Sequence, residues 1–200
     1  MKWSVVGRFC ALVVVIFMSH LISCTSKDKV ETTVAGDPWF RAARTADIEV
    51  MKKMVAEGKE VDSTSEVGVT ALLVASRMGN LQTMKWLLEN GANAKHLDHD
   101  RQSALSYALT GLATGPKQVQ AVELLLKHGA DPFVVDVIGF VPVMEMLALE
   151  MDGPLKMLSY SEKRQCDRMP KVKGEMTLSQ AARKMNRIDL AEFFEKQGCW

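Results

Sequence analysis

The feature that most constrains the fold of this chain is a pattern that returns every 33 residues. Glu-Gly at positions 57–58 returns as Asn-Gly at 90–91, Thr-Ala-Leu at 70–72 returns as Ser-Ala-Leu at 103–105, and alanine occupies positions 42, 75 and 108. A constant period of this length is typical of solenoids, in which each unit packs mainly against its two neighbours. The sequence therefore predicts an array of similar units.

The composition supports a folded domain and argues against nucleic-acid binding. Of the 200 residues, 48% are hydrophobic and 24% are charged, which leaves ample apolar surface to bury. There are 25 basic and 24 acidic residues, and two of the basic ones, Lys2 and Arg8, lie in a segment that we expect to be removed. The remaining charge is nearly balanced, so the composition does not provide the basic surface typical of nucleic-acid-binding proteins.

Each unit has the pattern of two short helices. Asp37 and Pro38 can serve as an N-cap and a first helical residue, and they predict that the folded part begins at residue 37. Apolar residues then recur at helical spacing in two runs, and Gly58 ends the second run as a left-handed C-cap would. The second unit follows the pattern most closely, through Thr70, Ala71, Leu72, Ala75, Gly79, Leu81, Met84, Trp86, Leu87, Leu88, Gly91, Ala92 and Asn93.

In these residues the chain resembles the ankyrin repeat, with alanine at positions 71 and 104 where that family commonly has proline. The resemblance implies an all-α solenoid of about five helix-turn-helix repeats over residues 37–200. It also implies hairpin fingers that project between successive repeats. The fourth repeat departs furthest from the family pattern, and we expect it to be degenerate.

Departures from the period distinguish this chain within that pattern. The third repeat is longer than the second, and we expect its additional residues in a loop at 109–117 between its helices. In the fourth repeat we expect a first helix at 144–151, a shortened second helix at 154–160 and an irregular basic loop at 161–174. A last repeat from Thr177 should close the stack with a hydrated outer face, formed by Gln180, Arg183, Lys184, Glu192, Glu195 and Lys196.

The resemblance further implies where a partner binds, because ankyrin proteins commonly use their finger tips and first helices. The third finger is unusual, since Val137, Ile138 and Phe140 are apolar where the family commonly has charged residues. Two interpretations remain open: this finger is an interface, or the loops around Gly111 and Cys166 fold over it and bury it. The full set of expected contact residues is Glu66, Val67, Val69, Arg77, Met78, Leu97, His99, Asp100, Gln102, Val135, Val137, Ile138 and Phe140.

Residues 1–23 have the composition of a secretory signal peptide. Lys2 and Arg8 accompany an apolar run at 9–18, which is short for a bilayer-spanning helix of about 20 residues. Leu-Ile-Ser-Cys at 21–24 resembles the bacterial lipobox, which implies cleavage before Cys24 and attachment of several acyl chains to it as a stable membrane anchor. Ordinary signal cleavage and an uncleaved anchor remain the alternatives.

The segment after the signal peptide links the anchor to the domain. Residues 24–36 are polar beyond Cys24 and are typical of a short flexible tether. By resemblance to lipoprotein sorting in Gram-negative bacteria, Thr25 rather than aspartate after the cysteine favours the outer membrane. We therefore expect an exported, lipid-anchored protein of the periplasm.

Two cysteines remain after Cys10 is removed and Cys24 is lipidated. In an oxidising compartment an even pair, Cys166 and Cys199, suggests a disulfide that ties the last repeat to the segment before it. The bond would stabilise the fold by about 3–4 kcal/mol in the chain-entropy model. Two unpaired thiols are the alternative.

Residues typical of catalytic or metal sites are few. His96, Asp98, His99 and Asp100 form the only cluster of metal-ligand types, and we interpret them as a hydrated finger because no clear further ligand accompanies them. Residues 111–117 resemble a phosphate-binding loop too weakly to count, and the basic residues at 163–173 are diluted by acidic neighbours. We expect no cofactor, no metal and no enzymatic activity.

These features together predict a non-enzymatic protein-binding module of the cell envelope. By resemblance to exported bacterial ankyrin proteins, we expect it to bind and inhibit a secreted or periplasmic enzyme, such as a lipase or a peptidoglycan hydrolase, and so to protect the cell. The alternative is an envelope scaffold or stress-related protein that organises other periplasmic proteins. We expect a protein partner, a membrane contact through the lipid anchor, no nucleic acid, and a monomer when free.

Overall fold

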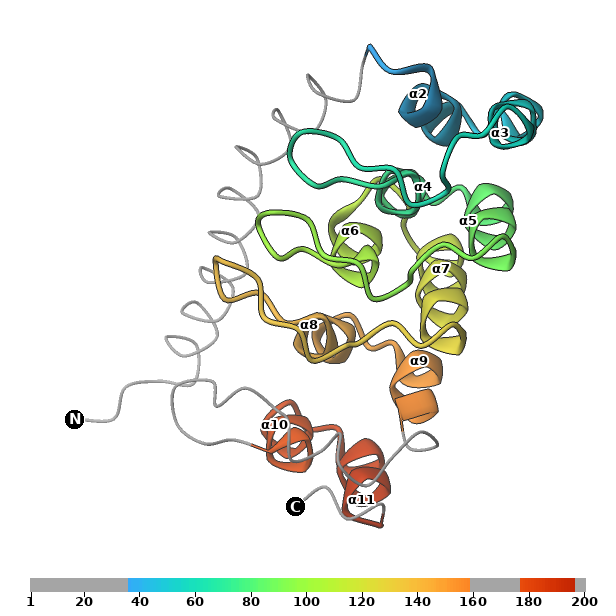
Figure 1. The fold of residues 1–200 in the computed structure, drawn as a ribbon. Helices are drawn as coiled ribbons and strands as arrows, with labels where there is room; N and C mark the ends of the chain where they lie inside the picture. Colours follow the sequence, from blue (N-terminus) through green and yellow to red (C-terminus); the bar gives the residue numbers. More distant parts are fainter. Residues whose placement is uncertain (1–35, 159–176, 197–200) are drawn as a thin grey trace.

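The computed structural model describes residues 36–158 and 177–196, and all structural statements below concern these residues. They fold into helices that stack in pairs, without a β-strand in the described part (Figure 1). The signal peptide, Cys24, the basic loop and the Cys166–Cys199 pair lie outside the described ranges. The helices are α2 (Pro38–Thr45), α3 (Ile48–Ala56), α4 (Ala71–Met78), α5 (Leu81–Glu89), α6 (Ala104–Thr110), α7 (Pro116–Lys127), α8 (Pro142–Ala148), α9 (Asp152–Met157), α10 (Leu178–Lys184) and α11 (Ile188–Lys196).

The stack has two layers of helices. The first helices of the repeats, α2, α4, α6 and α8, contact one another in order, and so do α5, α7 and α9 of the second layer. Figure 1 shows α10 and α11 as the last pair and three hairpin loops, before α4, α6 and α8, that project to the same side. The described helices confirm the expected all-α solenoid of about five helix pairs.

The 33-residue period is visible in the helix starts. Thr70 and Ser103 have extended backbone, and each side chain accepts a hydrogen bond from the N–H three residues later. Asp37 caps α2, with Pro38 as the first helical residue, as predicted. Each cap satisfies a donor that the first helical turn leaves open, which contributes about 1 kcal/mol.

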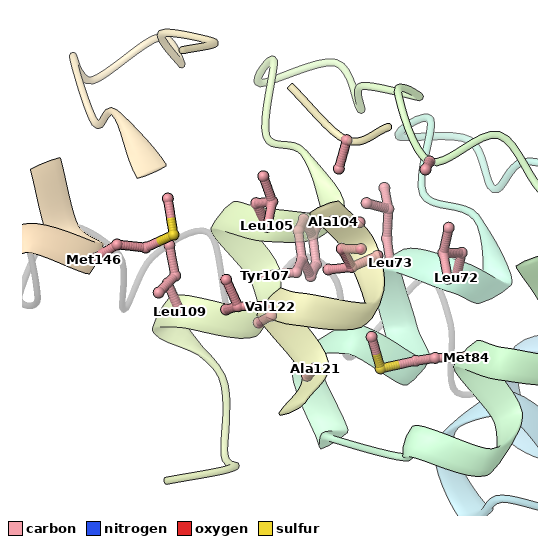
Figure 2. Packing of buried hydrophobic residues seen from close by; sticks show 14 of the residues in the cluster. Leu72, Leu73, Met84, Ala104, Leu105, Tyr107, Leu109, Ala121, Val122 and Met146 are labelled. Atoms are coloured by element: carbon pink, nitrogen blue, oxygen red, sulfur yellow. The ribbon is translucent and has the colours of Figure 1, made fainter. Parts of the chain in front are cut away.

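The core lies between the layers and between neighbouring repeats. Figure 2 shows Leu72 and Leu73 of α4 beside Leu105 of α6, with Met84 of α5 below them. The leucines and Met84 are at most 1% exposed, so each contributes about 1.5–3 kcal/mol through its burial. Ala75 and Ala108 are equally buried, and their small side chains let the first helices of adjacent repeats approach closely.

The third repeat carries its extra residues between α6 and α7, as predicted, and they pack on the second repeat. Leu112 donates its N–H to the carbonyl of Arg77 at 2.7 Å. Gln118 donates its side-chain amide to the carbonyl of Leu109 at 2.8 Å and so closes the loop. Because Gly79 lies under this loop, a Cβ there would meet the Cβ of Ala113 at 2.3 Å.

The fourth repeat contains two short helices, but their predicted positions were wrong. Helix α8 begins at Pro142, two residues before the expected start, and ends three residues before the expected end. Helix α9 begins at Asp152 instead of residue 154. A proline is tolerated anywhere in the first helical turn because the N–H groups there have no partner within the helix, so Pro154 does not mark the start.

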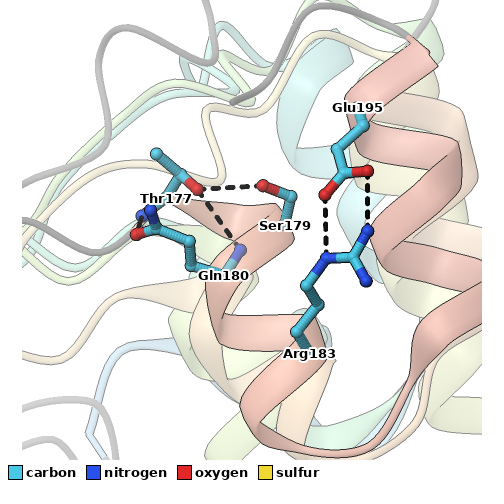
Figure 3. Close-up of polar contacts among 5 residues, drawn as sticks. All are labelled: Thr177, Ser179, Gln180, Arg183 and Glu195. Atoms are coloured by element: carbon cyan, nitrogen blue, oxygen red, sulfur yellow. Dashed lines mark hydrogen bonds and ion pairs between the residues drawn. The ribbon is translucent and has the colours of Figure 1, made fainter.

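The last repeat begins with a capping box at Thr177 and Gln180 (Figure 3). On its outer face Arg183 makes two hydrogen bonds to Glu195, at 2.9 and 2.8 Å, and joins α10 to α11. This pair raises the pKa of Arg183 and lowers the pKa of Glu195 through their mutual hydrogen bonds. The predicted surface residues of this repeat are exposed, except Glu195, which is half-buried.

Candidate protein-binding surface

Each finger is folded around one side chain at its base. This side chain is Ser65 in the first finger, before α4, Asp98 in the second, before α6, and Asp136 in the third, before α8. In the second finger, Asp98 Oδ1 accepts the N–H groups of Asp100 and Gln102 at 2.9 and 2.8 Å. In the third finger, Asp136 Oδ1 accepts those of Ile138 and Phe140 at 3.0 and 2.8 Å. A carboxylate that accepts two backbone N–H groups holds the turn in one conformation.

The first finger uses a shorter version of the same arrangement. Ser65 Oγ accepts the N–H of Val69 at 3.2 Å, and Ser65 donates its own N–H to the carbonyl of Val69 at 2.9 Å. Val69 is fully buried, because it directly precedes the N-cap of α4 and packs into the stack. The expectation that Val69 belongs to the partner surface is therefore wrong.

Successive fingers are joined by backbone hydrogen bonds. The N–H of His99 donates to the carbonyl of Val67 at 3.2 Å, and the N–H of Val137 donates to the carbonyl of Asp100 at 3.1 Å. Arg101 adds a side-chain bond from Nε to the carbonyl of Val135 at 3.2 Å. The three fingers therefore form one continuous ladder.

The residues considered as metal ligands have other roles. Asp98 is only 8% exposed and accepts the phenol O–H of Tyr107 at 2.8 Å, so the interpretation of Asp98 as hydrated was wrong. The ring of His96 makes a 2.7 Å hydrogen bond with the carbonyl of Gly68, whereas His99 and Asp100 are exposed. Within residues 36–158 and 177–196, no three histidine, cysteine or acidic side chains are grouped as metal ligands.

Burial shifts the pKa of both members of the Asp98–Tyr107 pair. Desolvation raises the pKa of Asp98 above its ordinary value, against the lowering effect of the hydrogen bonds that it accepts. Desolvation also raises the pKa of Tyr107, and the charge of Asp98 adds to that rise. The pair joins the second finger to α6 and belongs to the scaffold.

The tip of the third finger is open to solvent. Val137 is 61% and Ile138 45% exposed, while Phe133 at the base of the finger is 6% exposed. The loop that begins at Gly111 packs on Arg77 instead. Burial of the tip by the loop at Gly111 is therefore contradicted, whereas the loop around Cys166 lies outside the described residues.

The remaining expected contact residues lie on the same finger and first-helix surface. Glu66, His99 and Asp100 are exposed. The half-buried members are Val67, Arg77, Met78, Leu97, Gln102, Val135 and Phe140. Exposed and half-buried residues of the three fingers thus form a row, which we call the finger row, with the apolar tip at one end.

Sequence reasoning missed a second apolar feature. Leu112, in the loop between α6 and α7, is 66% exposed although the backbone around it is tightly held. Leu149, the C-cap residue directly after α8, is 44% exposed. The signal that could have identified Leu112 was a bulky apolar residue directly after Gly111, within an insertion that the repeat does not need.

The described helices include none that is long and apolar enough to cross a membrane. Residues 39–136 match a family model described as ankyrin repeats (3 copies). This match covers the first three repeats and the base of the third finger.

Similar curated proteins match over the same region. Ankyrin repeat, SAM and basic leucine zipper domain-containing protein 1 of Rhinolophus ferrumequinum is 33% identical over 108 residues, which are 54% of this chain and 22% of that protein. The protein of that name from Microcebus murinus is 34% identical over 119 residues, 58% of this chain and 24% of its own length. The chain spans at most about a quarter of these relatives, so the similarity concerns the repeats alone. Residues 39–136 are therefore ankyrin repeats, and the described helices form an ankyrin-repeat solenoid, a general protein–protein interaction module.

Proposed function

We propose that this chain is a lipid-anchored, non-enzymatic protein of the cell envelope that binds and inhibits a secreted or periplasmic enzyme. The lipobox-like segment before Cys24 supports the anchor, and the ankyrin solenoid supports the binding of a protein. Inhibition follows from binding alone when a rigid surface covers an active-site cleft. A typical stable interface needs about 800 Å² from each partner.

The observation that carries the proposal is the exposed apolar tip on a rigid finger. Val137 and Ile138 are 61% and 45% exposed, although the backbone of both residues is hydrogen-bonded to Asp100 and Asp136. Exposed apolar groups on a pre-ordered backbone lose little conformational entropy on binding, and such groups at an interface centre commonly carry much of the binding energy. The tip thus supports a docking function for the finger row.

The proposal can be tested by comparing the wild-type chain with the double variant Val137→Asp/Ile138→Asp. Wild-type protein, purified with its lipid anchor in mild detergent, should capture an envelope hydrolase from extracts of its own cells and reduce the activity of that enzyme. The double variant should lose both effects with an unchanged melting temperature. Ile188→Asp is the matched control, because Ile188 is 44% exposed but lies on α11, away from the fingers.

Capture of a protein without any loss of its activity would contradict inhibition and favour a scaffold. Capture that persists in the double variant would show that the finger tip is not the docking site. A melting temperature several degrees lower in the double variant than in Ile188→Asp would show that the tip supports the fold.

A further inference from the structure

Cations on the first and second helices of the early repeats differ in whether they have acidic partners. On the second helices of the first two repeats, lysines pair with glutamates one turn away, as Lys85 does with Glu89 at 3.8 Å. On the first helices of the same repeats, Arg41, Arg44 and Arg77 form no ion pair with a described residue. The three arginines therefore carry charge without a counter-charge in the described part of the chain.

The sequence around Arg77 explains why acidic partners are lacking there. Residues 67–88 and 101–122 contain no aspartate and no glutamate. Helices α4 and α6, and the loop between α6 and α7, lie within these two ranges. These elements therefore contribute no carboxylate that could neutralise the guanidinium of Arg77.

The three arginines belong to one surface across α2 and α4. Arg44 and Arg77 hold equivalent positions, 33 residues apart, on helices that contact each other. The side-chain amide of Asn80 donates to the carbonyls of Ala43 and Arg44, at 2.9 Å each, and so holds the turn after α4 against the end of α2. Arg41 precedes Arg44 by three residues and shares its face of α2.

A structural role accounts for only part of this surface. Arg44 and Arg77 lie in the last turns of their helices, where a cation interacts favourably with the helix dipole. Arg41 lies outside the last turn of α2. A role at the helix ends therefore does not account for all three arginines.

The inserted loop of the third repeat places an aliphatic side chain beside Arg77. Leu112 donates its N–H to the carbonyl of Arg77 at 2.7 Å. Gly111 permits this close approach, because a Cβ there would lie 2.3 Å from the same carbonyl oxygen. The side chain of Leu112 is nevertheless 66% exposed. Positive charge and exposed apolar surface therefore adjoin here, and we call Arg41, Arg44, Arg77 and Leu112 the insertion edge.

The sequence of this chain outside the described ranges does not offer the opposite charge. Residues 1–35 contain four basic and two acidic side chains, and residues 159–176 contain five basic and three acidic ones. Both segments thus have a net positive charge, which opposes their binding to a group of arginines. Three arginines are also fewer than the roughly four to eight basic residues typical of segments that bind anionic lipids. The balance of charge favours a different, acidic protein.

We infer that the partner protein presents an acidic segment to the insertion edge, with an aliphatic side chain next to its carboxylates. The guanidinium groups of Arg44 and Arg77 bind the carboxylates through paired N–H donors, a geometry that suits arginine better than lysine. Leu112 contacts the aliphatic side chain of the same segment. This inference rests on the proposed function, because it specifies the chemistry of the protein that the solenoid binds.

The test selects linear peptides of twelve residues from a phage library on the full-length chain in mild detergent. Selected peptides should carry two or more acidic residues beside an aliphatic one, and their affinity should fall as the salt concentration rises. Arg44→Gln/Arg77→Gln should weaken binding by about tenfold or more, because it removes two charged donors. Arg77→Lys should retain more of the affinity than Arg77→Gln, and Leu112→Ser should weaken binding by about threefold or more.

Two control variants match these changes on the second helices. Lys52→Gln/Lys85→Gln removes the same charge from the same two repeats, at side chains that are 51% and 66% exposed. Ile188→Ser removes an aliphatic side chain that is 44% exposed on α11. Both controls should bind the selected peptides as the wild type does.

Other outcomes would overturn the inference. Selected peptides without acidic residues, or equal binding to the arginine double variant, would exclude an acidic segment at this edge. Phosphatidylglycerol vesicles that bind the wild type but not the arginine variant, with no acidic peptide selected, would make a membrane the occupant. A concentration-dependent dimer that the arginine variant loses would make it a second copy. A melting temperature several degrees lower in Leu112→Ser than in Ile188→Ser would show that the chain itself covers the edge.

The same variants separate this inference from the proposed function. Hydrolase capture and inhibition that persist in the arginine double variant would leave the proposed function intact and refute only the acidic contact. Failure to capture any hydrolase, with acidic peptides still bound through the arginines, would refute the proposed function and leave the insertion edge as a site for another acidic protein.

Discussion

The phenol of Tyr107 donates a hydrogen bond of 2.8 Å to Oδ2 of Asp98 and thereby joins the second finger to the middle of α6. Oδ1 of the same carboxylate accepts two backbone N–H groups of the finger. One buried side chain therefore sets both the shape of the finger and its orientation on the helix layer. This arrangement makes the finger row a rigid extension of the solenoid.

Tyr107→Phe should lower the free energy of unfolding by about 1–2 kcal/mol, because it removes the phenol donor to Asp98 while leaving the aromatic packing in place. Urea denaturation followed by circular dichroism measures the change. Asp98→Ala should cost more than Tyr107→Phe, because it also leaves the N–H groups of Asp100 and Gln102 without their acceptor. Equal stability of Tyr107→Phe and wild type would show that the bond does not hold the finger.

The raised pKa of Asp98 predicts a pH dependence of defined sign. When a carboxyl group has a higher pKa in the folded state, the folded state binds more protons, so stability falls as the pH rises from the ordinary value of 3.8 through the folded value. Asp98→Asn keeps an oxygen acceptor but does not titrate. The wild type should therefore lose stability relative to Asp98→Asn as the pH rises above about 4.

The measurement is a series of urea titrations of both proteins between about pH 3.5 and 7, with the difference in unfolding free energy plotted against pH. Subtracting the unfolding free energy of Asp98→Asn removes the contribution of the other carboxyl groups. These include Glu195, whose lowered pKa makes stability rise with pH. A difference that is constant over this range, or that rises with pH, would contradict the raised pKa. In Tyr107→Phe the fall should extend to higher pH, because the Tyr107 hydrogen bond lowers the pKa of Asp98.

The repeats were predictable from the sequence because their signals are local. Caps such as Thr70 and Ser103, and small residues such as Ala75, act within a few residues of their own position. The 33-residue period then predicts at which position of each repeat such a residue recurs. The interpretation of Asp98 as hydrated failed for the opposite reason. Its burial depends on Tyr107, nine residues later, and no property of the finger sequence alone reveals that contact.

The finger row was predictable in outline, whereas the exposure of its members was not. Val69 and Val137 are both valines in fingers, yet one is fully buried and the other 61% exposed. The difference arises because Val69 directly precedes a helix cap, whereas Val137 lies in the turn that Asp136 organises. Leu112 shows the same limit, because the packing of its loop on Arg77 involves a different repeat.

Gly79→Ala should be one of the most damaging single-methyl changes in the chain. Gly79 has φ +66°, a conformation that costs a residue with a Cβ about 1–2 kcal/mol, and an added Cβ would also collide with Ala113. Overpacking adds about 1–3 kcal/mol. Gly91→Ala is the control, because Gly91 has φ +90° and open space around it, so it has the backbone strain alone. If thermal or urea denaturation gave the two variants equal losses, the loop would not press on Gly79.

Thr177→Ala should destabilise the last repeat by about 1 kcal/mol, because it removes the side-chain acceptor for the N–H of Gln180 and half of the capping box. Thr177→Ser keeps the acceptor and should restore most of the loss, whereas Thr114→Ala, at an exposed loop position, should change little.

Hydrogen exchange measures the effect of Thr177→Ala repeat by repeat. Amides of α10 and α11 should exchange faster in this variant, while those of α4 and α6 keep their wild-type rates. The reason is that a solenoid transmits stability mainly between neighbouring repeats. Uniformly faster exchange in all repeats would show instead that the stack opens as one unit.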